Sequence, residues 1–197
     1  PTRCFVSGLQ PSQFSTMSPM YIRRLFDEFE KRTNALPVDI VAGGLERLID
    51  QGRSDEMHSL MDDNLPLEAR VAAVDSFRGL LRYFEAHCAP VPSHDSENPR
   101  APINEVCYQW WDRFPAFPMP ENPRRKPVEA AFIGLMADAL KSNSLSVQEY
   151  GLHGLGHWHH DYPKEVEAAV DDYLNRNPKL EAAMKSYAAS AREGMVS

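Results

Sequence analysis

The sequence predicts an all-α protein, on three observations. Apolar residues recur every three or four positions along most of the 197-residue chain. Proline, serine and glycine interrupt this period at points where helices start and stop. No segment shows the sustained alternation of apolar and polar residues that a half-buried strand needs.

The N-terminal half divides into an arm and four helices. Residues 1–17 show no period and are expected to form an extended arm, and residues 18–197 a single helical domain. The expected helices of this half are residues 19–32, a second from Pro37 to a stop at Gly52, a short third capped by Ser54, and a long fourth from Pro66 to Cys88.

Proline-rich segments interrupt the second half. Residues 89–102 hold four prolines and no period, which indicates a loop and a candidate subdomain boundary. The next helix carries Val106 and Trp110 and runs into a second proline-rich segment at 115–127, whose prolines favour an extended path. The remaining expected helices are 128–141, 146–160, 164–176 and 179–193.

Composition excludes several classes of function. Hydrophobic residues make up 43% of the chain and charged residues 25%, which is typical of a globular protein and not of a disordered one. A net charge of −7 argues against nucleic acid as a partner, although Arg124–Lys126 form a short basic run. No apolar stretch is long enough to suggest a membrane span.

The cysteines fit a reducing compartment. Cys4, Cys88 and Cys107 are odd in number and widely spaced, so neither a disulfide framework nor a zinc ribbon is indicated. The N-terminus also lacks the pattern of a signal peptide. We therefore expect a cytoplasmic protein with reduced thiols.

Two stretches of the chain share one plan. In each, a helix leads through a tight turn into a second helix that restarts with an apolar residue followed by Glu or Gln. An offset of 80 positions aligns Leu67 with Val147 and Glu68 with Gln148. A repeated order of helix, turn and helix is typical of stacked helical repeats.

The second of these stretches resembles a HEAT-type helical pair. Residues 146–174 combine the Val-Gln-Glu start with small residues at Gly151, Gly154 and Gly156 and a following Pro-x-x-Val helix. The resemblance implies a short α-α superhelix of stacked helix pairs, a fold that binds other proteins along its grooves. The string His-Gly-Leu-Gly-His-Trp at 153–158 is also similar to one in uncharacterised bacterial proteins, and it implies no function.

Histidines are concentrated in one short segment. Four of the seven fall within eight positions, followed directly by an aspartate: His153, His157, His159, His160 and Asp161. On a helix, His153 and His157 lie one above the other, as a shared metal ion requires. With His160 and Asp161 as further ligands, this set suits zinc, iron or manganese. Gly154 stands where a metalloprotease motif needs Glu, so that chemistry is disfavoured.

Two other interpretations of the histidines stay open. His153 and His157 can be packing residues between helices, with His159 and His160 exposed at a helix C-terminus. His160-Asp161 can also be the paired residues of an HD-type metal phosphohydrolase, although the spacing to the other ligands is poor. Those other ligands would come from His87 or His94 and from Asp171 or Asp172.

The densest aromatic cluster has a functional and a structural interpretation. It consists of Trp110, Trp111, Phe114 and Phe117. As a surface, it would be a partner-binding patch or a platform for a proline-rich ligand. As a core element, it would pack the proline-rich loop at 112–127 against the helices. Large aromatic residues are usually buried in this way.

Three functions follow from these observations. The first expectation is a non-catalytic helical-repeat scaffold that binds another protein. The alternative is a metal-binding protein or metal-dependent hydrolase centred on His153 and His157. The third is a small-ligand or nucleic-acid binder, which the acidic charge disfavours. The sequence shows no phosphate-binding glycine loop and no nucleophile elbow, so it assigns no catalytic residue.

Overall fold

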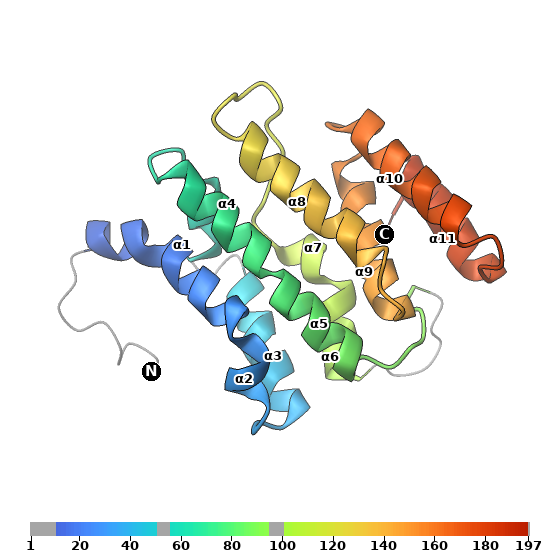
Figure 1. Cartoon of the computed structure of the whole chain (residues 1–197), viewed down its shortest axis with the longest axis horizontal. Coiled ribbons are helices and arrows are strands. Elements are labelled where there is room, and N and C mark those ends of the chain that lie inside the picture. The colour runs from blue at the N-terminus through green and yellow to red at the C-terminus, as the bar shows by residue number, and fades with distance from the viewer. Residues whose placement is uncertain (1–10, 51–55, 95–100, 197) are drawn as a thin grey trace.

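The computed structural model describes residues 11–50, 56–94 and 101–196, and it confirms the all-α prediction for them, because they form helices and no strand (Figure 1). The elements in chain order are α1 (Pro11–Asp27), α2 (Phe29–Thr33), α3 (Val38–Ile49), the 3-10 helix η1 (Met57–Met61), α4 (Leu67–Ser76), α5 (Arg78–His87), α6 (Pro102–Tyr108), α7 (Trp110–Arg113), α8 (Lys126–Ala139), α9 (Leu145–Trp158), α10 (Pro163–Arg176) and α11 (Ala182–Arg192). Among these, no helix has both the length and the apolar character needed to cross a membrane.

Most of the helices pack against helices that are not their neighbours in the chain, and α9 lies at the centre of the C-terminal half. α4 packs between α1 and α8, and these three run alongside one another across the molecule (Figure 1). Behind them, α6 contacts both α3 and α9. α9 also contacts α5, α7, α8, α10 and α11, so it is packed on nearly every side. The superhelix and the HEAT-type relationship expected from the sequence stay predictions.

The expected N-terminal arm is wrong for residues 11–17, which form the first turns of α1. Pro11 suits the first position of a helix, because the N–H that it lacks would have no partner there. The Ser18–Pro19 pair suggested a helix start, but Pro19 lies inside α1, where it removes a single backbone hydrogen bond. Residues 1–10 lie outside the described residues.

The helix expected from Pro66 to Cys88 is interrupted once. α4 ends and α5 starts on either side of Phe77, whose φ of −60° and ψ of −13° depart only slightly from helical values. The Phe77 ring is buried against Phe26 and Phe114, at centroid distances of 4.5 and 5.7 Å. The apolar period continues through the break, which explains why the sequence showed one helix.

Three of the four residues proposed as a partner-binding patch are core residues. Trp110, Trp111 and Phe114 are 0%, 7% and 2% exposed, so they cannot form a surface patch, and the structural interpretation holds for them. Trp110 stacks on Phe114, and Phe114 meets Phe132 of α8 edge-on at 5.6 Å. Only Phe117 of the four is exposed, at 61%.

Glycines let α9 approach its neighbours closely. A Cβ atom at Gly151 would lie 2.6 Å from the carbonyl oxygen of Met136, in the backbone of α8. A Cβ atom at Gly154 would lie 2.6 Å from the indole Nε1 of Trp111. Separations under 3 Å are closer than atoms tolerate, so a side chain at either position would push α8 or α7 away.

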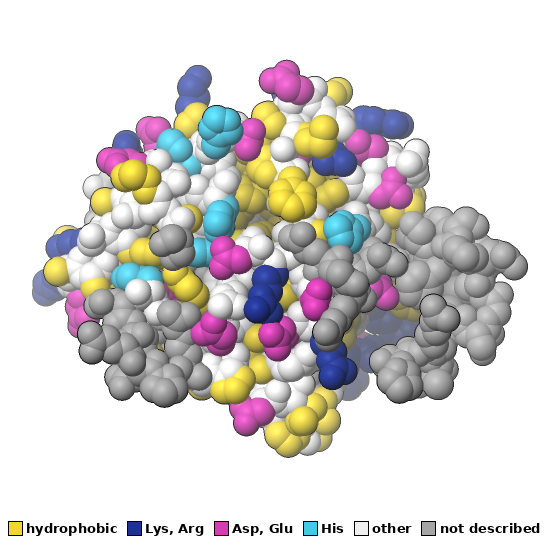
Figure 2. All heavy atoms as spheres, turned by 180° about the vertical axis from the view of Figure 1, so that it is seen from behind, with side chains coloured by type: hydrophobic (Ala, Val, Ile, Leu, Met, Phe, Trp, Pro, Cys, Tyr) yellow, Lys and Arg dark blue, Asp and Glu magenta, His cyan; other side chains and the backbone are white. Residues whose placement is uncertain are grey.

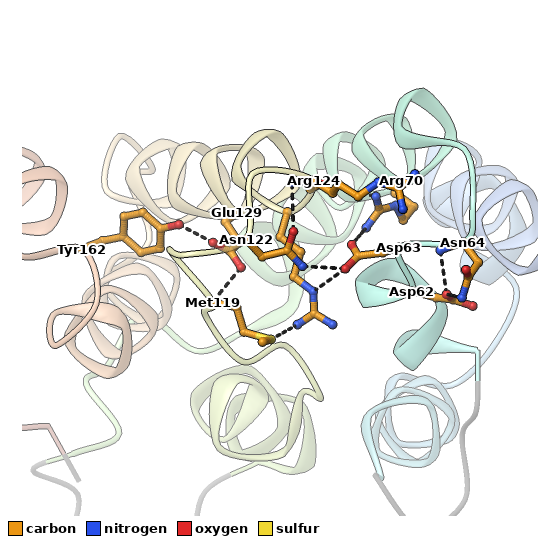
Figure 3. Close-up of polar contacts among 10 residues, drawn as sticks. Asp62, Asp63, Asn64, Arg70, Met119, Asn122, Arg124, Glu129 and Tyr162 are labelled. Atoms are coloured by element: carbon orange, nitrogen blue, oxygen red, sulfur yellow. Dashed lines mark hydrogen bonds and ion pairs between the residues drawn. The ribbon is translucent and has the colours of Figure 1, made fainter.

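Buried charges clamp the proline-rich loop that precedes α8 (Figure 3). Arg70 of α4 is 2% exposed, and its guanidinium donates to Asp63 and to the carbonyl oxygen of Arg124, each at 3.3 Å. The Asn122 amide donates to the same Asp63 carboxylate at 2.6 Å. Burial by itself would raise the pKa of Asp63, but the hydrogen bond from Asn122 and the nearby guanidinium groups together lower it, so that carboxyl stays ionised under the loop.

A second buried carboxylate fixes the other side of the loop. Glu129 of α8 is fully buried and accepts the backbone N–H of Met119 at 2.8 Å and the hydroxyl of Tyr162 (Figure 3). Both of its oxygens therefore have a donor, which is what a buried charge requires. The proline-rich detour seen in the sequence is thus held in one position.

Candidate metal centre

Two histidines of α9 meet at their ring nitrogens. His153 and His157 are four residues apart, so one helical turn places them on the same face. Their Nε2 atoms are 3.1 Å apart and their rings are nearly perpendicular, at 82°. His153 is fully buried, whereas the His157 side chain is 37% exposed. The pairing inferred from the sequence spacing is therefore present in the fold.

An aspartate from a distant part of the chain completes the group. The Oδ1 atom of Asp112 lies 2.9 Å from the Nε2 of His157 and 3.1 Å from the Nε2 of His153. Asp112 belongs to the short helix α7, which is anchored in the core by the buried rings of Trp110 and Trp111. The carboxylate points away from that core and is 39% exposed. Within the described residues, Asp112, His153 and His157 are the one group of three side chains placed to share a metal ion.

The other ligands expected from the sequence are not part of this group. α9 ends at Trp158, two residues earlier than expected, so His160 and Asp161 lie in the following turn, off the helical face of His153. The Asp161 N–H donates to the Trp158 carbonyl oxygen at 3.2 Å, which closes that turn. His159 contacts Glu167 of α10 at 3.5 Å. The proposed ligands His160 and Asp161 are thus replaced by Asp112.

The residues of the HD-type interpretation are also dispersed. His87 packs on the ring of Tyr83, at a centroid distance of 4.2 Å. His94 pairs with Glu149, and Asp171 pairs with Arg192. Asp172 pairs with Arg176, and among the described residues none of these four side chains joins His160 or Asp161 in a group that could hold a metal ion. The arrangement that an HD-type site needs is therefore not formed.

The three donor atoms form a nearly equilateral triangle. Its edges are 2.9, 3.1 and 3.1 Å. A metal with bonds of about 2.1 Å spaces adjacent ligand atoms by about 3.0 Å at octahedral corners and about 3.4 Å at tetrahedral ones. The triangle therefore has the dimensions of one face of a metal's coordination sphere. Two histidines and one carboxylate on such a face are the donor set of zinc and iron sites with open positions.

No arrangement of protons on the two imidazoles gives a hydrogen bond along each of the three edges while the Asp112 carboxylate is an acceptor. Asp112 is an acceptor, so each histidine needs a proton on Nε2 to bond with it. Two protonated Nε2 atoms would then face each other at 3.1 Å, donor against donor. Removing one of these protons leaves a bare nitrogen facing the carboxylate. A cation resolves the conflict, because each of the three atoms can then direct a lone pair at it.

Asp112 is held in its ionised form. Hydrogen bonds from His153 and then from His157 bring the pKa of its carboxyl well below the usual value of 3.8, against a smaller opposing effect of burial. A carboxylate that is already ionised matches what a metal ion requires of an oxygen ligand.

A second layer of polar groups surrounds the buried histidine. The hydroxyl of Tyr187 in α11 lies 2.5 Å from the Nδ1 of His153. The ring of His94 stacks on Tyr187, at a centroid distance of 4.1 Å and an angle of 11°. His94 is in turn held by Glu149, a carboxylate that is 1% exposed and also accepts the backbone N–H groups of Ser93 and His94. Outer-shell contacts of this kind orient a metal-ligating histidine.

The site reaches the surface at Asp112 and His157. His153 and Tyr187 are buried, while Asp112 and His157 are partly exposed. On the face shown in Figure 2, most of the visible histidine side chains lie in the left half, where the turn of the molecule places the C-terminal helices. An ion at the triangle would therefore be reachable from solvent past Asp112 and His157.

Comparison of the chain with known proteins finds no matching protein-family model, no matching curated protein and no matching solved structure.

The ionised Asp112 predicts a pH-dependent contribution to stability. Its pKa is lower in the folded protein than the unfolded value of about 3.8, so its contribution is complete above that pH and is lost as the pH falls further toward the folded pKa. We expect metal-free Asp112→Asn to unfold at lower urea concentration than the wild type at pH 7, and the gap to narrow below about pH 4. Urea midpoints between pH 2.5 and pH 7 measure this gap. A gap that stays constant over the range would contradict the prediction.

Proposed function

We propose that this protein binds a divalent transition-metal ion through Asp112, His153 and His157. The observation that carries the proposal is the triangle of donor atoms. With an ionised Asp112, no placement of protons makes a hydrogen bond along each of its three edges. The ligand types favour zinc, iron or manganese over calcium or magnesium, which prefer oxygen ligands. Burial of His153 among helices also fixes its ring before the ion arrives.

Three protein ligands leave coordination positions open. Closed structural zinc sites use four protein ligands, whereas catalytic sites keep a position for water or substrate. Zinc bound in this way lowers the pKa of its water to about 7 and so supplies hydroxide near neutral pH. A metal-dependent hydrolase is therefore the activity that this donor set favours. Asp112, His153 and His157 would hold the ion, and the solvent-facing side would admit the substrate.

A scaffold that binds another protein, the first expectation from the sequence, stays a prediction. One observation favours it: Phe117 and Met119 are 61% and 48% exposed on the loop that Glu129 and Asp63 clamp. A loop that is already ordered loses little conformational entropy when it binds. This function uses a different surface from the metal triangle, so both can belong to one protein.

A cobalt titration tests the metal proposal. Metal-free protein without an affinity tag is titrated with Co²⁺, whose visible absorption reports nitrogen and oxygen coordination. We expect one equivalent to bind, and His157→Ala to weaken binding by more than about 100-fold, since outer-shell changes alone cost 10- to 100-fold. His157 is chosen because its side chain is partly exposed, so its removal leaves the core intact.

His159→Ala is the matched control. His159 is two residues further along, contacts Glu167, and lies outside the group of three ligands. It is expected to bind Co²⁺ as the wild type does. If the wild type binds no Co²⁺, or if His157→Ala and His159→Ala bind equally, the proposed metal site is wrong.

A further inference from the structure

The buried histidine of the triangle uses both of its ring nitrogens. The Nε2 of His153 faces Asp112 and His157, and its Nδ1 faces the hydroxyl of Tyr187 at 2.5 Å. A neutral imidazole has one N–H and one bare nitrogen, so the state of Nε2 decides the role of Nδ1. The Tyr187 contact is therefore linked to whatever occupies the triangle.

Without a metal, the contact between His153 and Asp112 sets this role. The Nε2 of His153 lies 3.1 Å from the Oδ1 of Asp112, and a carboxylate oxygen accepts hydrogen bonds, so a His153 ring with one proton carries it on Nε2. Its Nδ1 is then an acceptor, and the Tyr187 hydroxyl donates to it.

With a metal, the roles exchange. A histidine that binds a metal through Nε2 gives the ion its lone pair and carries its proton on Nδ1. The Nδ1–H then donates, and the Tyr187 oxygen accepts. On the basis of the proposed metal site, we propose that Tyr187 is the positioning residue of that site, and that metal binding reverses the direction of its hydrogen bond with His153.

Tyr187 is built to act in both directions. Its hydroxyl also forms a hydrogen bond with Tyr108, so it has a second partner whichever way the bond to His153 runs. A tyrosine hydroxyl has one proton to donate and lone pairs that accept, so it can serve either role. The stacked ring of His94, itself tied to Glu149, holds the Tyr187 ring in place.

Through Tyr187, a third helix contributes a side chain to the site. Tyr187 lies in α11, which packs on α9 and α10, whereas the three proposed ligands lie in α7 and α9. Removing the hydroxyl alone would leave the Nδ1–H of metal-bound His153 buried and without an acceptor. Removal of the Tyr187 hydroxyl should therefore lower the metal affinity, and not only the stability of the helix packing.

Tyr187→Phe tests the positioning role, with Tyr173→Phe as its matched control. Tyr173 is also a buried tyrosine, its hydroxyl donates to the side chain of Gln148 at 2.8 Å, and it lies in α10, outside the group of three ligands. We expect Tyr187→Phe to weaken Co²⁺ binding by about 10- to 100-fold, and Tyr173→Phe to leave it within about twofold of the wild type. Circular dichroism of both variants checks that the helices are retained.

The tautomer of His153 in the wild-type protein gives an independent readout. Long-range proton–nitrogen NMR spectra at about pH 8 distinguish a proton on Nε2 from one on Nδ1, with zinc as the added metal. We expect the proton on Nε2 before zinc is added and on Nδ1 afterwards. This measurement needs no variant, so it decides the question even if Tyr187→Phe fails to fold.

The outcomes separate this inference from the function on which it rests. If the wild type binds no Co²⁺ and no zinc, the proposed function fails. If it binds them, but Tyr187→Phe binds equally well or the His153 proton stays on Nε2, the metal site stands and the role of Tyr187 is overturned.

Discussion

Gly79→Ala is expected to lower the free energy of unfolding by about 3 kcal/mol or more, the upper end of what an extra methyl group costs in a packed core. A Cβ atom at Gly79 would lie 2.0 Å from the carbonyl oxygen of Phe26 and 3.0 Å from its carbonyl carbon. Both atoms belong to the backbone of α1, so no side chain can rotate to make room. α5 and α1 would have to separate where Phe26 and Phe77 fill the core between them.

Chemical denaturation of the metal-free protein measures this loss, and Gly134→Ala is the control. Gly134 is also inside a helix, but a Cβ atom there meets nothing within 4 Å. Alanine is the better helix former, so this variant should be more stable than the wild type by up to about 1 kcal/mol. A Gly79→Ala variant with the stability of Gly134→Ala would show that α1 and α5 do not approach as closely as described.

Zinc is expected to raise the midpoint of thermal unfolding by roughly 8 to 16 °C when its free concentration is about 1,000 times the dissociation constant. Binding to the folded state alone then adds about 4 kcal/mol. Each kcal/mol shifts the midpoint by about 2–4 °C in a chain of this size. The effect has a structural basis, because the ion would link α7 to α9 across residues far apart in the sequence.

Differential scanning calorimetry with and without zinc measures this shift. His157→Ala is expected to lose most of it, since two ligands remain, whereas His159→Ala should keep it. Equal shifts in the wild type and in His157→Ala would mean that zinc stabilises the protein somewhere other than the triangle.

The helices could be predicted from sequence because their apolar period is strong, and their ends could not. Ser18-Pro19 and Ser146 both read as helix starts, yet α1 begins at Pro11 and the residue before α9 is Ser144. A serine or proline is compatible with a helix start but does not require one when the neighbouring helices already pack against the flanking turns. The burial of Trp110 and Phe114, by contrast, follows from their size.

Part of the candidate metal centre could be predicted in the same way. His153 and His157 are four residues apart, and helical geometry alone puts them together. Asp112 could not be found, since it lies 41 residues before His153 and its position depends on how α7 packs on α9. The one local signal is its place in the segment Trp-Trp-Asp-Arg-Phe, where two charged residues lie among three aromatic ones. Tyr187 and His94 likewise reach the site only through the packing of distant segments.

The most direct test of the metal centre is an anomalous-difference map from crystals of the protein grown with zinc, with data collected on both sides of the zinc absorption edge. We predict one strong peak at about 2.1 Å from the Oδ1 of Asp112 and from the Nε2 atoms of His153 and His157. The Nδ1 of His153 should remain in contact with Tyr187. A map with no peak at this triangle, or with zinc bound at His159 or His160 in its place, would contradict the account.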